Sequence, residues 1–312
     1  MPTRRSLPTL LATALLIACA GGNGAPQSTT AARQPRGYLL IVGGGPQPHA
    51  LVQRFVDLAG GSGHARIIVF PMASVDGEEG GRIKADDLQL LGARATSLNI
   101  TRAQANSDSV AQLLDSATGI WFGGGDQDRL FAVLHDTKVE AAIHARYQAG
   151  AVVGGTSAGA AVMSSPMITG EERHPGGARP DTSSAFMTIA RNNIITAPGF
   201  GFLTDAIVDQ HFLRRKRHNR LLSLVLEGPV HLGVGIDEST GLLVYPDGHW
   251  EVLGASAALV YDARHSAVTP PGAHVLGATG VVLHVLPAGS RYDPASGHAS
   301  LPTVSADTAQ QQ

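Results

Sequence analysis

The sequence is poor in cysteine, in aromatic residues and in net charge. Cys19 is the single cysteine among 312 residues, so neither an intramolecular disulfide nor a thiolate metal site can form. Aromatic residues make up 5% of the chain and the formal net charge is −2, which argues against stacking platforms and basic surfaces for nucleic acids. We therefore expect no nucleic-acid partner.

Motifs for metals, nucleotides and phosphates are also missing. The 13 histidines include no H-E-x-x-H spacing, and no P-loop occurs. The three glycines at 43–45 are followed by Pro46 and do not have the dinucleotide-binding spacing. We therefore predict neither a metal site nor a cofactor.

The apolar run near the N-terminus is too short for a membrane-spanning helix. Arg4 and Arg5 precede it, and Leu16-Ile17-Ala18-Cys19 resembles a bacterial lipobox. Residues 1–18 are therefore predicted to be an export signal peptide, with Cys19 lipidated and 19–36 a flexible tether. The chain is then exported and membrane-anchored on the periplasmic or extracellular side, or secreted if Cys19 is an incidental cysteine that is not lipidated.

Apolar runs and helical segments alternate about five times in the first half of the chain. Strands are expected at 37–42, 65–71, 95–100, 119–122 and 151–153, and helices at 51–58, 83–91, 110–116 and 130–148. This alternation predicts an α/β fold with a doubly wound, mostly parallel, flavodoxin-like (class I glutaminase-like) sheet and helices on both faces.

The C-terminal part has a different pattern. Strand-like runs lie at 241–245, 249–253, 257–261 and 280–286. The turn at 246–248 predicts a hairpin, and together the runs predict an antiparallel extension within a single domain at 37–290. The composition of 170–184 is typical of a mobile surface loop, and that of 291–312 is typical of a disordered polar tail.

A glycine-flanked serine carries the strongest chemical signal. Gly155-Thr156-Ser157-Ala158-Gly159 follows the apolar run at 151–153 and leads into a small-residue helix start. This order is typical of a nucleophile elbow, and its glycines permit the dihedral angles that a sharp strand-to-helix turn requires. We predict that Ser157 is a nucleophile, with a tight structural turn as the alternative.

A serine nucleophile needs a base, and the base needs an orienting partner. His211 stands between the apolar run at 206–208 and a basic segment. Farther along, the apolar run at 233–236 ends in Asp237 and Glu238, where the carboxyl end of a strand would present a carboxylate. These positions are candidates for the base and its partner.

Four segments occur in the order found in cyanophycinases. They are 121–127, 155–160, 209–212 and 235–240. The chain from about residue 38 to about residue 261 thus resembles the serine peptidase family that contains cyanophycinases and α-aspartyl dipeptidases. The resemblance implies Ser157 as nucleophile, His211 as general base and Glu238 as the carboxylate that orients it. The implied oxyanion donors are the amide of Ala158 and the loop at Gly124 and Gly125.

The resemblance also implies the chemistry of the substrate pocket. Family members cut next to aspartate, and cyanophycin is a polyaspartate backbone with arginine on each side-chain carboxyl. Such a pocket needs cations for carboxylates and acceptors for guanidinium groups. The residues expected to line it are Gln127, Asp209, Gln210, Arg215, Arg217 and Arg220. A solvated helix face is the alternative for the basic run at 214–220.

Together these observations predict an exported serine peptidase that acts on a peptide or on cyanophycin. It is expected to release β-Asp-Arg dipeptides through an acyl-enzyme, and the resemblance suggests a homodimer. One alternative is an α-aspartyl dipeptidase that acts on short Asp-X peptides. The other is a catalytically inactive surface binding module.

Overall fold

The computed structural model describes residues 37–174, 177–180 and 188–303. The predicted export signal, Cys19 and the predicted tether lie outside these residues. Within the described ranges, every helix is too short or too polar to span a membrane. The described residues all belong to one unit, Gln34–Gln312.

The larger sheet contains nine strands in the order β18-β17-β12-β11-β1-β5-β4-β2-β3. Its parallel part consists of β1 (Leu39–Val42), β5 (Val152–Thr156), β4 (Gly119–Phe122), β2 (Arg66–Phe70) and β3 (Arg94–Ser97). The associated helices are α1 (His49–Leu58), α2 (Gly77–Leu90), α3 (Arg102–Ala105), α4 (Asp108–Gln112), α5 (Gln127–Leu134), α6 (Lys138–Gln148) and α7 (Ala158–Ala161). The predicted α/β sheet with a parallel core is thus confirmed.

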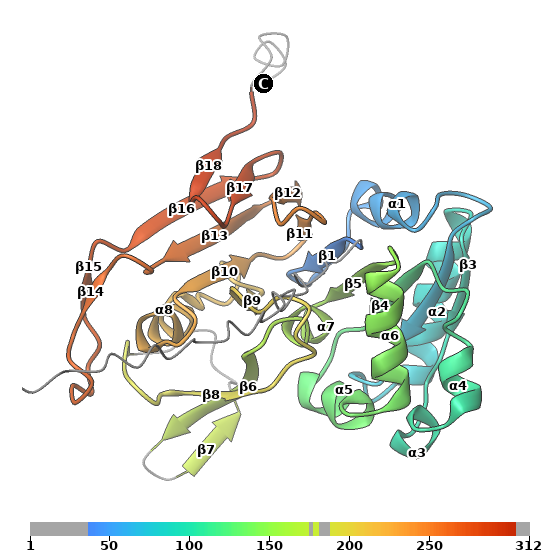
Figure 1. Cartoon of the computed structure of the whole chain (residues 1–312), viewed down its shortest axis with the longest axis horizontal. Coiled ribbons are helices and arrows are strands. Elements are labelled where there is room, and N and C mark those ends of the chain that lie inside the picture. Colours follow the sequence, from blue (N-terminus) through green and yellow to red (C-terminus); the bar gives the residue numbers. More distant parts are fainter. Residues whose placement is uncertain (1–36, 175–176, 181–187, 304–312) are drawn as a thin grey trace, which may run out of the picture. The chain divides into compact units, whose positions relative to one another are not determined.

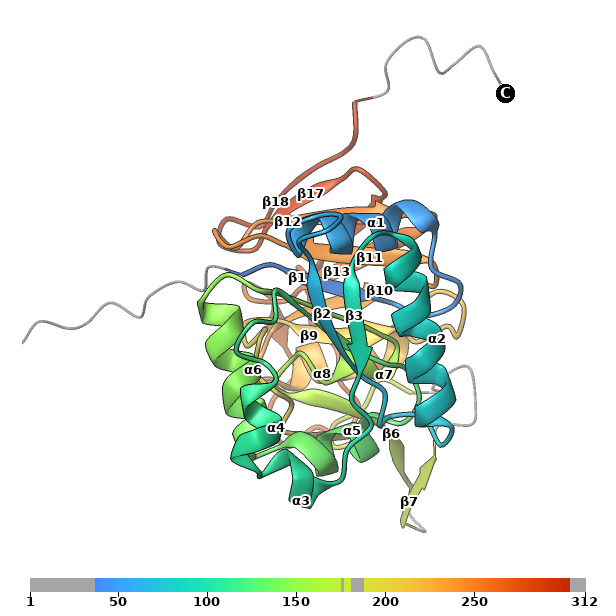
Figure 2. The same cartoon turned by 90° about the vertical axis from the view of Figure 1, so that its right-hand side faces the viewer.

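Alternate side chains of the parallel strands pack into two separate cores. On β1, Leu39 and Ile41 join the core that includes side chains of α5, α6 and α7. Leu40 and Val42 join the core beneath α1 and α2. Both faces of the strand are therefore buried, which is why its sequence is apolar throughout. Figure 2 shows α2 on one side of β2 and β3, and α6 on the other.

The single helix predicted at 130–148 is two helices, α5 and α6. Between them, Asp136 has a φ of 55°, a left-handed conformation that a continuous right-handed helix excludes. The Thr137 hydroxyl then accepts a hydrogen bond from the N–H of Glu140 and caps α6. Local capping thus divides an otherwise continuous apolar pattern.

The predicted C-terminal hairpin is confirmed. Strands β11 (Thr240–Val244) and β12 (Trp250–Gly254) pair antiparallel, and β11 also pairs with β1. The prediction of a disordered tail is wrong for 291–303, because β17 (Arg291–Asp293) and β18 (His298–Ser300) extend the same sheet. Tyr292 is 1% exposed and its ring centroid lies 5.2 Å from that of Trp250. This aromatic contact anchors an otherwise polar segment, and 304–312 lie outside the described residues.

A second sheet, which the sequence pattern does not separate from the first, holds four strands in the order β16-β13-β10-β9. These strands are β9 (Ile207–Gln210), β10 (Leu232–Ile236), β13 (Ala257–Asp262) and β16 (Val282–Pro287). Strands β9 and β10 are parallel, and the helix α8 (His218–Glu227) connects them (Figure 1). It shares a core with Ile207 of β9, and a Cβ on Gly233 of β10 would lie 2.6 Å from Cγ2 of its Val225. The carboxyl ends of the two parallel strands therefore lie at the same edge of the sheet.

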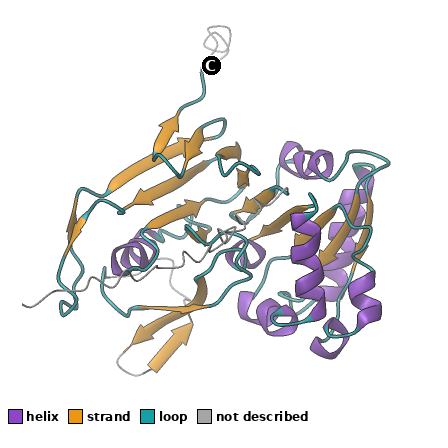
Figure 3. Ribbon diagram, in the orientation of Figure 1, coloured by secondary structure: helices purple, strands orange, loops and turns teal. Residues whose placement is uncertain are grey.

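The region at 170–184, predicted as a mobile loop, contributes to a three-stranded sheet in the order β7-β6-β8. Its strands are β6 (Met167–His174), β7 (Gly177–Pro180) and β8 (Ile194–Ala197). A separate two-stranded sheet is formed by β14 (Ala267–Val268) and β15 (Ala278–Thr279). The loop prediction is wrong for 170–174 and 177–180, because these residues belong to the paired strands β6 and β7. Residues 175–176 and 181–184 lie outside the described residues. Figure 3 shows that strands predominate from β6 onward.

Candidate active site

Ser157 lies at the turn between β5 and α7, as the glycine-flanked motif predicts. Its φ of 54° and ψ of −112° are strained for a residue with a side chain. The flanking glycines make this turn sterically feasible. A Cβ on Gly155 would lie 2.5 Å from the carbonyl oxygen of Gly159, and one on Gly159 would lie 2.3 Å from that of Phe122. The N–H of Ser157 donates to the carbonyl oxygen of Val42 at 3.0 Å, which attaches the turn to β1.

Two hydrogen bonds connect Ser157 to a histidine and a carboxylate. Oγ of Ser157 lies 2.8 Å from Nε2 of His211, and Nδ1 of His211 lies 2.7 Å from Oε1 of Glu238. His211 directly follows β9 and has a φ of 50°, and Glu238 lies just beyond the end of β10. The larger sheet thus supplies the serine, and the smaller sheet supplies the histidine and the glutamate.

The glycine loop at 43–45, which follows β1, packs against both His211 and Glu238, a role that its sequence alone does not indicate. The N–H of His211 donates to the carbonyl oxygen of Gly43 at 2.7 Å. A Cβ on Gly44 would lie 2.3 Å from Cε1 of His211, and one on Gly45 would lie 3.0 Å from Oε2 of Glu238. Only glycines allow such a close approach, so the loop fixes the imidazole and the carboxylate. The available signal was three glycines at the carboxyl end of a buried strand.

The surroundings of His211 favour a neutral imidazole. Burial has the largest effect and lowers the pKa of His211, the hydrogen bond to Glu238 raises it, and the charges of Arg215 and Arg217 lower it again. The net direction is downward. When Nδ1–H donates to the carboxylate, the lone pair of Nε2 faces Oγ of Ser157. The arrangement can therefore accept the proton of the serine hydroxyl.

The backbone amides expected to stabilise an oxyanion lie beside Ser157. Ala158 is the first residue of α7, and the N–H groups of a first helical turn have no intrahelical acceptor. A Cβ on Gly124 would lie 3.4 Å from Cβ of Ser157. Gly125 has a φ of 140° and lines the same cavity as Ser157. The structure thus brings both expected donor segments to the serine.

A cavity of about 500 Å³ opens onto Ser157. Its lining consists of Gly125, Asp126, Gln127, Asp128, Ser157, Gly170, Glu171, Gln210, Arg215, Arg217 and Arg220. Every residue predicted to bind substrate is in this lining except Asp209. Three of the lining residues, Arg215, Arg217 and Arg220, are called the arginine wall below.

Asp209 is 0% exposed, so the prediction that it contacts substrate is wrong. Its Oδ2 accepts from Nε of Arg220 at 2.7 Å, and its Oδ1 accepts from Nη2 of the same residue. Nη1 of Arg217 donates to the backbone oxygen and to Oε1 of Gln210, each at 2.9 Å. Arg217 and Arg220 are buried and Arg215 is exposed. The alternative of a solvated helix face is therefore wrong for Arg217 and Arg220, and the buried carboxylate of Asp209 holds Arg220 in place.

Three carboxylates that the sequence motifs do not single out line the same cavity. They belong to Asp126, Asp128 and Glu171 and are called the acidic cluster below. Burial raises the pKa of Asp128, and the charges of Asp126 and Glu171 raise it further, so the three groups interact. Between Asp126 and Asp128, Gln127 is buried and donates from Nε2 to the carbonyl oxygen of Ile168 at 3.1 Å. Glu171 was missed because its segment was predicted to be a loop, and the D-x-D spacing at 126–128 was the available signal.

One group of metal-ligand type occurs among the described residues, formed by His135, Asp136 and Glu140. The N–H of Asp136 donates to Oε2 of Glu140 at 2.6 Å, and Nδ1 of His135 lies 3.4 Å from Oε1 of Glu140. These contacts close the turn before α6. None of the three residues lines the cavity at Ser157.

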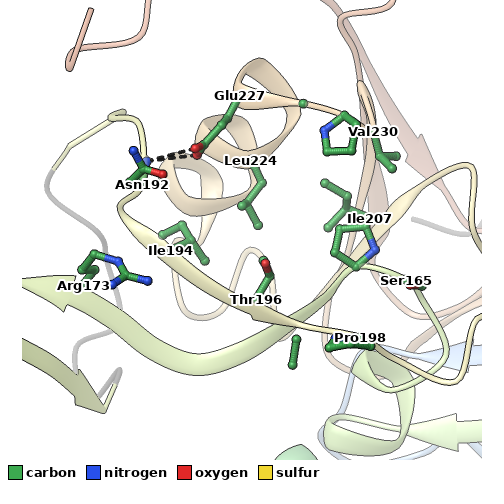
Figure 4. Close-up of a pocket in the computed structure, with 14 residues that line it drawn as sticks. Ser165, Arg173, Asn192, Ile194, Thr196, Pro198, Ile207, Leu224, Glu227 and Val230 are labelled. Carbon is green, nitrogen blue, oxygen red and sulfur yellow. Dashed lines mark hydrogen bonds between the residues drawn. The ribbon is translucent and has the colours of Figure 1, made fainter. Parts of the chain in front are cut away.

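A larger cavity of about 620 Å³ has residues of β8 and α8 in its lining (Figure 4). Figure 4 shows the carboxylate of Glu227 turned toward Asn192, whose backbone N–H donates to both oxygens at 3.2 and 3.1 Å. The apolar side chains of Ile194, Ile207 and Leu224 contribute to the same lining. Because none of the predicted site residues lies here, cavity size does not identify the reactive centre.

Comparison with protein families decides what kind of protein carries this site. The model of Peptidase family S51 matches residues 39–251, which is more than half of the chain. The chain belongs to peptidase family S51. It is therefore a serine-type peptidase, a hydrolase.

Relatives of this S51 peptidase include cyanophycinases of several cyanobacteria. It is 33% identical over 269 residues to the cyanophycinase of Synechococcus elongatus, and the aligned region covers 83% of this chain and 79% of that protein. It is 34% identical over 283 residues to the cyanophycinase of Trichormus variabilis, with 86% and 87% covered. The crystal structure of a peptidase from an acI-B1 Actinobacterium matches with a TM-score of 0.61 at 22% identity, covering 84% of this chain and 98% of that chain. This match supports the shared fold.

Proposed function

We propose that this S51 peptidase hydrolyses cyanophycin to β-Asp-Arg dipeptides. The observation that carries the proposal is that one cavity at Ser157 combines the arginine wall with the acidic cluster. Each residue of cyanophycin carries a carboxylate and a guanidinium group, since the arginine is joined to the aspartyl side chain. The cavity provides a group of opposite charge for each. The relatives named cyanophycinase support the same substrate.

In the proposed reaction, Oγ of Ser157 attacks the carbonyl carbon of an aspartyl residue while Nε2 of His211 takes the hydroxyl proton. Glu238 stabilises the imidazolium, and the amides at Ala158 and at the 124–125 loop bind the oxyanion. His211 then gives its proton to the leaving amine as the C–N bond breaks, which leaves an acyl-enzyme on Ser157. A water that His211 deprotonates attacks the acyl carbon. The carboxylate product leaves, and the proton returns to Oγ.

The arginine wall suits recognition of a carboxylate. Asp209 and Gln210 already hold Arg220 and Arg217 in fixed orientations, so binding does not have to order these long side chains. Arg215 is exposed and lines the cavity. We expect Arg215 to contact a substrate carboxylate directly.

The acidic cluster separates the two candidate substrates. An α-aspartyl dipeptidase that acts on short Asp-X peptides needs cations for the aspartyl carboxylate but has no general need for anions. Asp126, Asp128 and Glu171 lie in the cavity at Ser157, where they would repel an acidic peptide and attract a guanidinium group. This charge pattern favours the arginine-bearing polymer.

We also propose that the protein is exported, on the basis of the signal pattern at 1–18. Labelling with an alkyne-bearing fatty acid tests the anchor, because the expressed full chain should incorporate it and Cys19→Ser should not. Equal labelling of both proteins contradicts anchoring through Cys19.

The deciding experiment incubates cyanophycin with the chain 19–312 and identifies the soluble products by mass spectrometry. Wild type is expected to release β-Asp-Arg, and Ser157→Ala is expected to lose at least about 1000-fold in rate. A fluorophosphonate probe applied in parallel should label wild type and not Ser157→Ala. Labelling without polymer hydrolysis rejects cyanophycin as substrate and favours short Asp-X peptides. Absence of both labelling and hydrolysis supports the inactive binding module.

A further inference from the structure

A second, smaller cavity lies beside the 124–125 loop, which is close to Ser157. Its volume is about 230 Å³, and its lining includes Gln47, Lys84, Trp121, Gly123, Gly124 and Thr156. Thr156 precedes Ser157 in the chain, and a Cβ on Gly124 would lie 3.4 Å from Cβ of Ser157. The cavity with the arginine wall is lined by the next residues of the same two segments, Gly125 and Ser157. Consecutive residues of these two segments, at 124–125 and 156–157, therefore line the two cavities.

Lys84 is the cation of this smaller cavity. Its Nζ donates to Oε1 of Gln47 at 2.6 Å and lies 4.4 Å from the centroid of the Trp121 ring. Both of these direct contacts are to neutral groups. Burial lowers the pKa of Lys84 to about 8, and the charge of Asp87 raises it by less. The ammonium is thus the main form at neutral pH.

A partly buried ammonium without a carboxylate in direct contact is unfavourable, because the neutral contacts and the charge of Asp87 replace its lost hydration only in part. An anion that enters the cavity relieves this penalty. The ammonium also lies over the ring of Trp121, a cation–π contact that serves packing by itself. Packing alone requires no anion, so the two roles make different predictions.

We propose that Lys84 binds a carboxylate of the residue on the leaving side of the scissile bond. This inference rests on the proposed function, in which Ser157 cleaves between two aspartyl residues that both carry carboxylates. When the residue before the scissile bond occupies the cavity with the arginine wall, the residue after it lies at the cavity of Lys84. Lys84 is therefore a specificity residue for the leaving group and takes no part in proton transfer.

A matched pair of substrates tests this role. One is the two-unit oligomer of β-Asp-Arg, and the other is the same oligomer with the carboxylates of its leaving residue converted to carboxamides. The readout is the ratio of kcat/KM for the acid to that for the amide. We expect about a tenfold preference for the acid in wild type, the size of one charge-assisted hydrogen bond. In Lys84→Met this ratio of kcat/KM values should fall close to one.

Lys138→Met is the matched control, because Lys138 is exposed and its ion pair is with Asp108; it should keep the wild-type ratio. An unchanged ratio in folded Lys84→Met overturns the proposal, even if both rates fall together. Equal cleavage of the two substrates by wild type also overturns it, and that measurement needs no variant. If wild type cleaves neither substrate, the proposed function itself fails. Circular dichroism melting shows whether each variant is folded.

Discussion

Replacing Gly44 by alanine tests whether the glycine loop holds the hydrogen bonds of the site. A Cβ at this position would lie 2.3 Å from Cε1 and 2.4 Å from Nε2 of His211. Carbon atoms in contact are normally about 3.5–4.0 Å apart, so the imidazole or the loop must move by roughly 1 Å or more. Either movement separates Nε2 of His211 from Oγ of Ser157.

The expected effect on activity is much larger than the effect on folding. A misplacement of about 1 Å at a reacting group lowers the rate by about 100-fold, so kcat/KM should fall by at least that factor. The φ of 108° at Gly44 adds about 1–3 kcal/mol of backbone strain to an alanine. Such a loss is smaller than the free energy of unfolding of a typical domain, about 5–15 kcal/mol. The variant should therefore be folded but nearly inactive.

Gly272→Ala is the control for this experiment. Gly272 lies between β14 and β15, lines neither the cavity at Ser157 nor that of Lys84, and a Cβ there would have no other atom within 4 Å. This alanine should leave activity unchanged and raise the free energy of unfolding by about 0.4–1 kcal/mol. The assays are the rate of fluorophosphonate labelling, kcat/KM on cyanophycin and thermal melting. A folded Gly44→Ala protein with activity within twofold of wild type would refute the role given to the loop.

Two further predictions concern charge. The surroundings of His211 lower its pKa. Because a protonated imidazole cannot accept the serine proton, the midpoint of the acid limb in a pH profile of kcat/KM should lie below the ordinary histidine value of 6.5. Because Arg215 disfavours the imidazolium, Arg215→Gln should move this limb upward in a pH profile; a downward shift contradicts the argument. Asp128→Asn should reduce the preference for an arginine-bearing oligomer over its neutral citrulline analogue by about tenfold. The exposed Asp108→Asn should keep that preference, and an equal change in both variants excludes a specific role for the acidic cluster.

The parts of the site that the sequence predicts are those formed by neighbouring residues. The turn at Ser157 follows from an apolar strand, two glycines and small residues within one short segment, and the structure has that turn. The parallel strands follow from apolar runs, because both of their faces are buried. Local pattern and final structure agree where tertiary contacts reinforce the local preference.

The missed features depend on contacts between distant segments. Nothing in the short runs at β9 and β10 shows that they pair in a sheet of their own with β13 and β16. The polar segment around Tyr292 looks disordered by composition, yet the contact with Trp250 holds it. The sequence predicts Asp209 as a substrate contact, and only the structure shows that it is buried and paired with Arg220. Such pairings are set by the tertiary fold and not by periodicity.

The division of the site between two sheets also makes it a reporter of assembly. Ser157 belongs to the larger sheet, whereas His211 and Glu238 belong to the smaller one. During refolding, far-ultraviolet circular dichroism reports strands and helices wherever they form. Covalent capture of the serine by a fluorophosphonate also requires the correct contact between the two sheets, whose side chains share one core. A lag of capture behind circular dichroism would therefore measure the time by which this contact follows the formation of secondary structure.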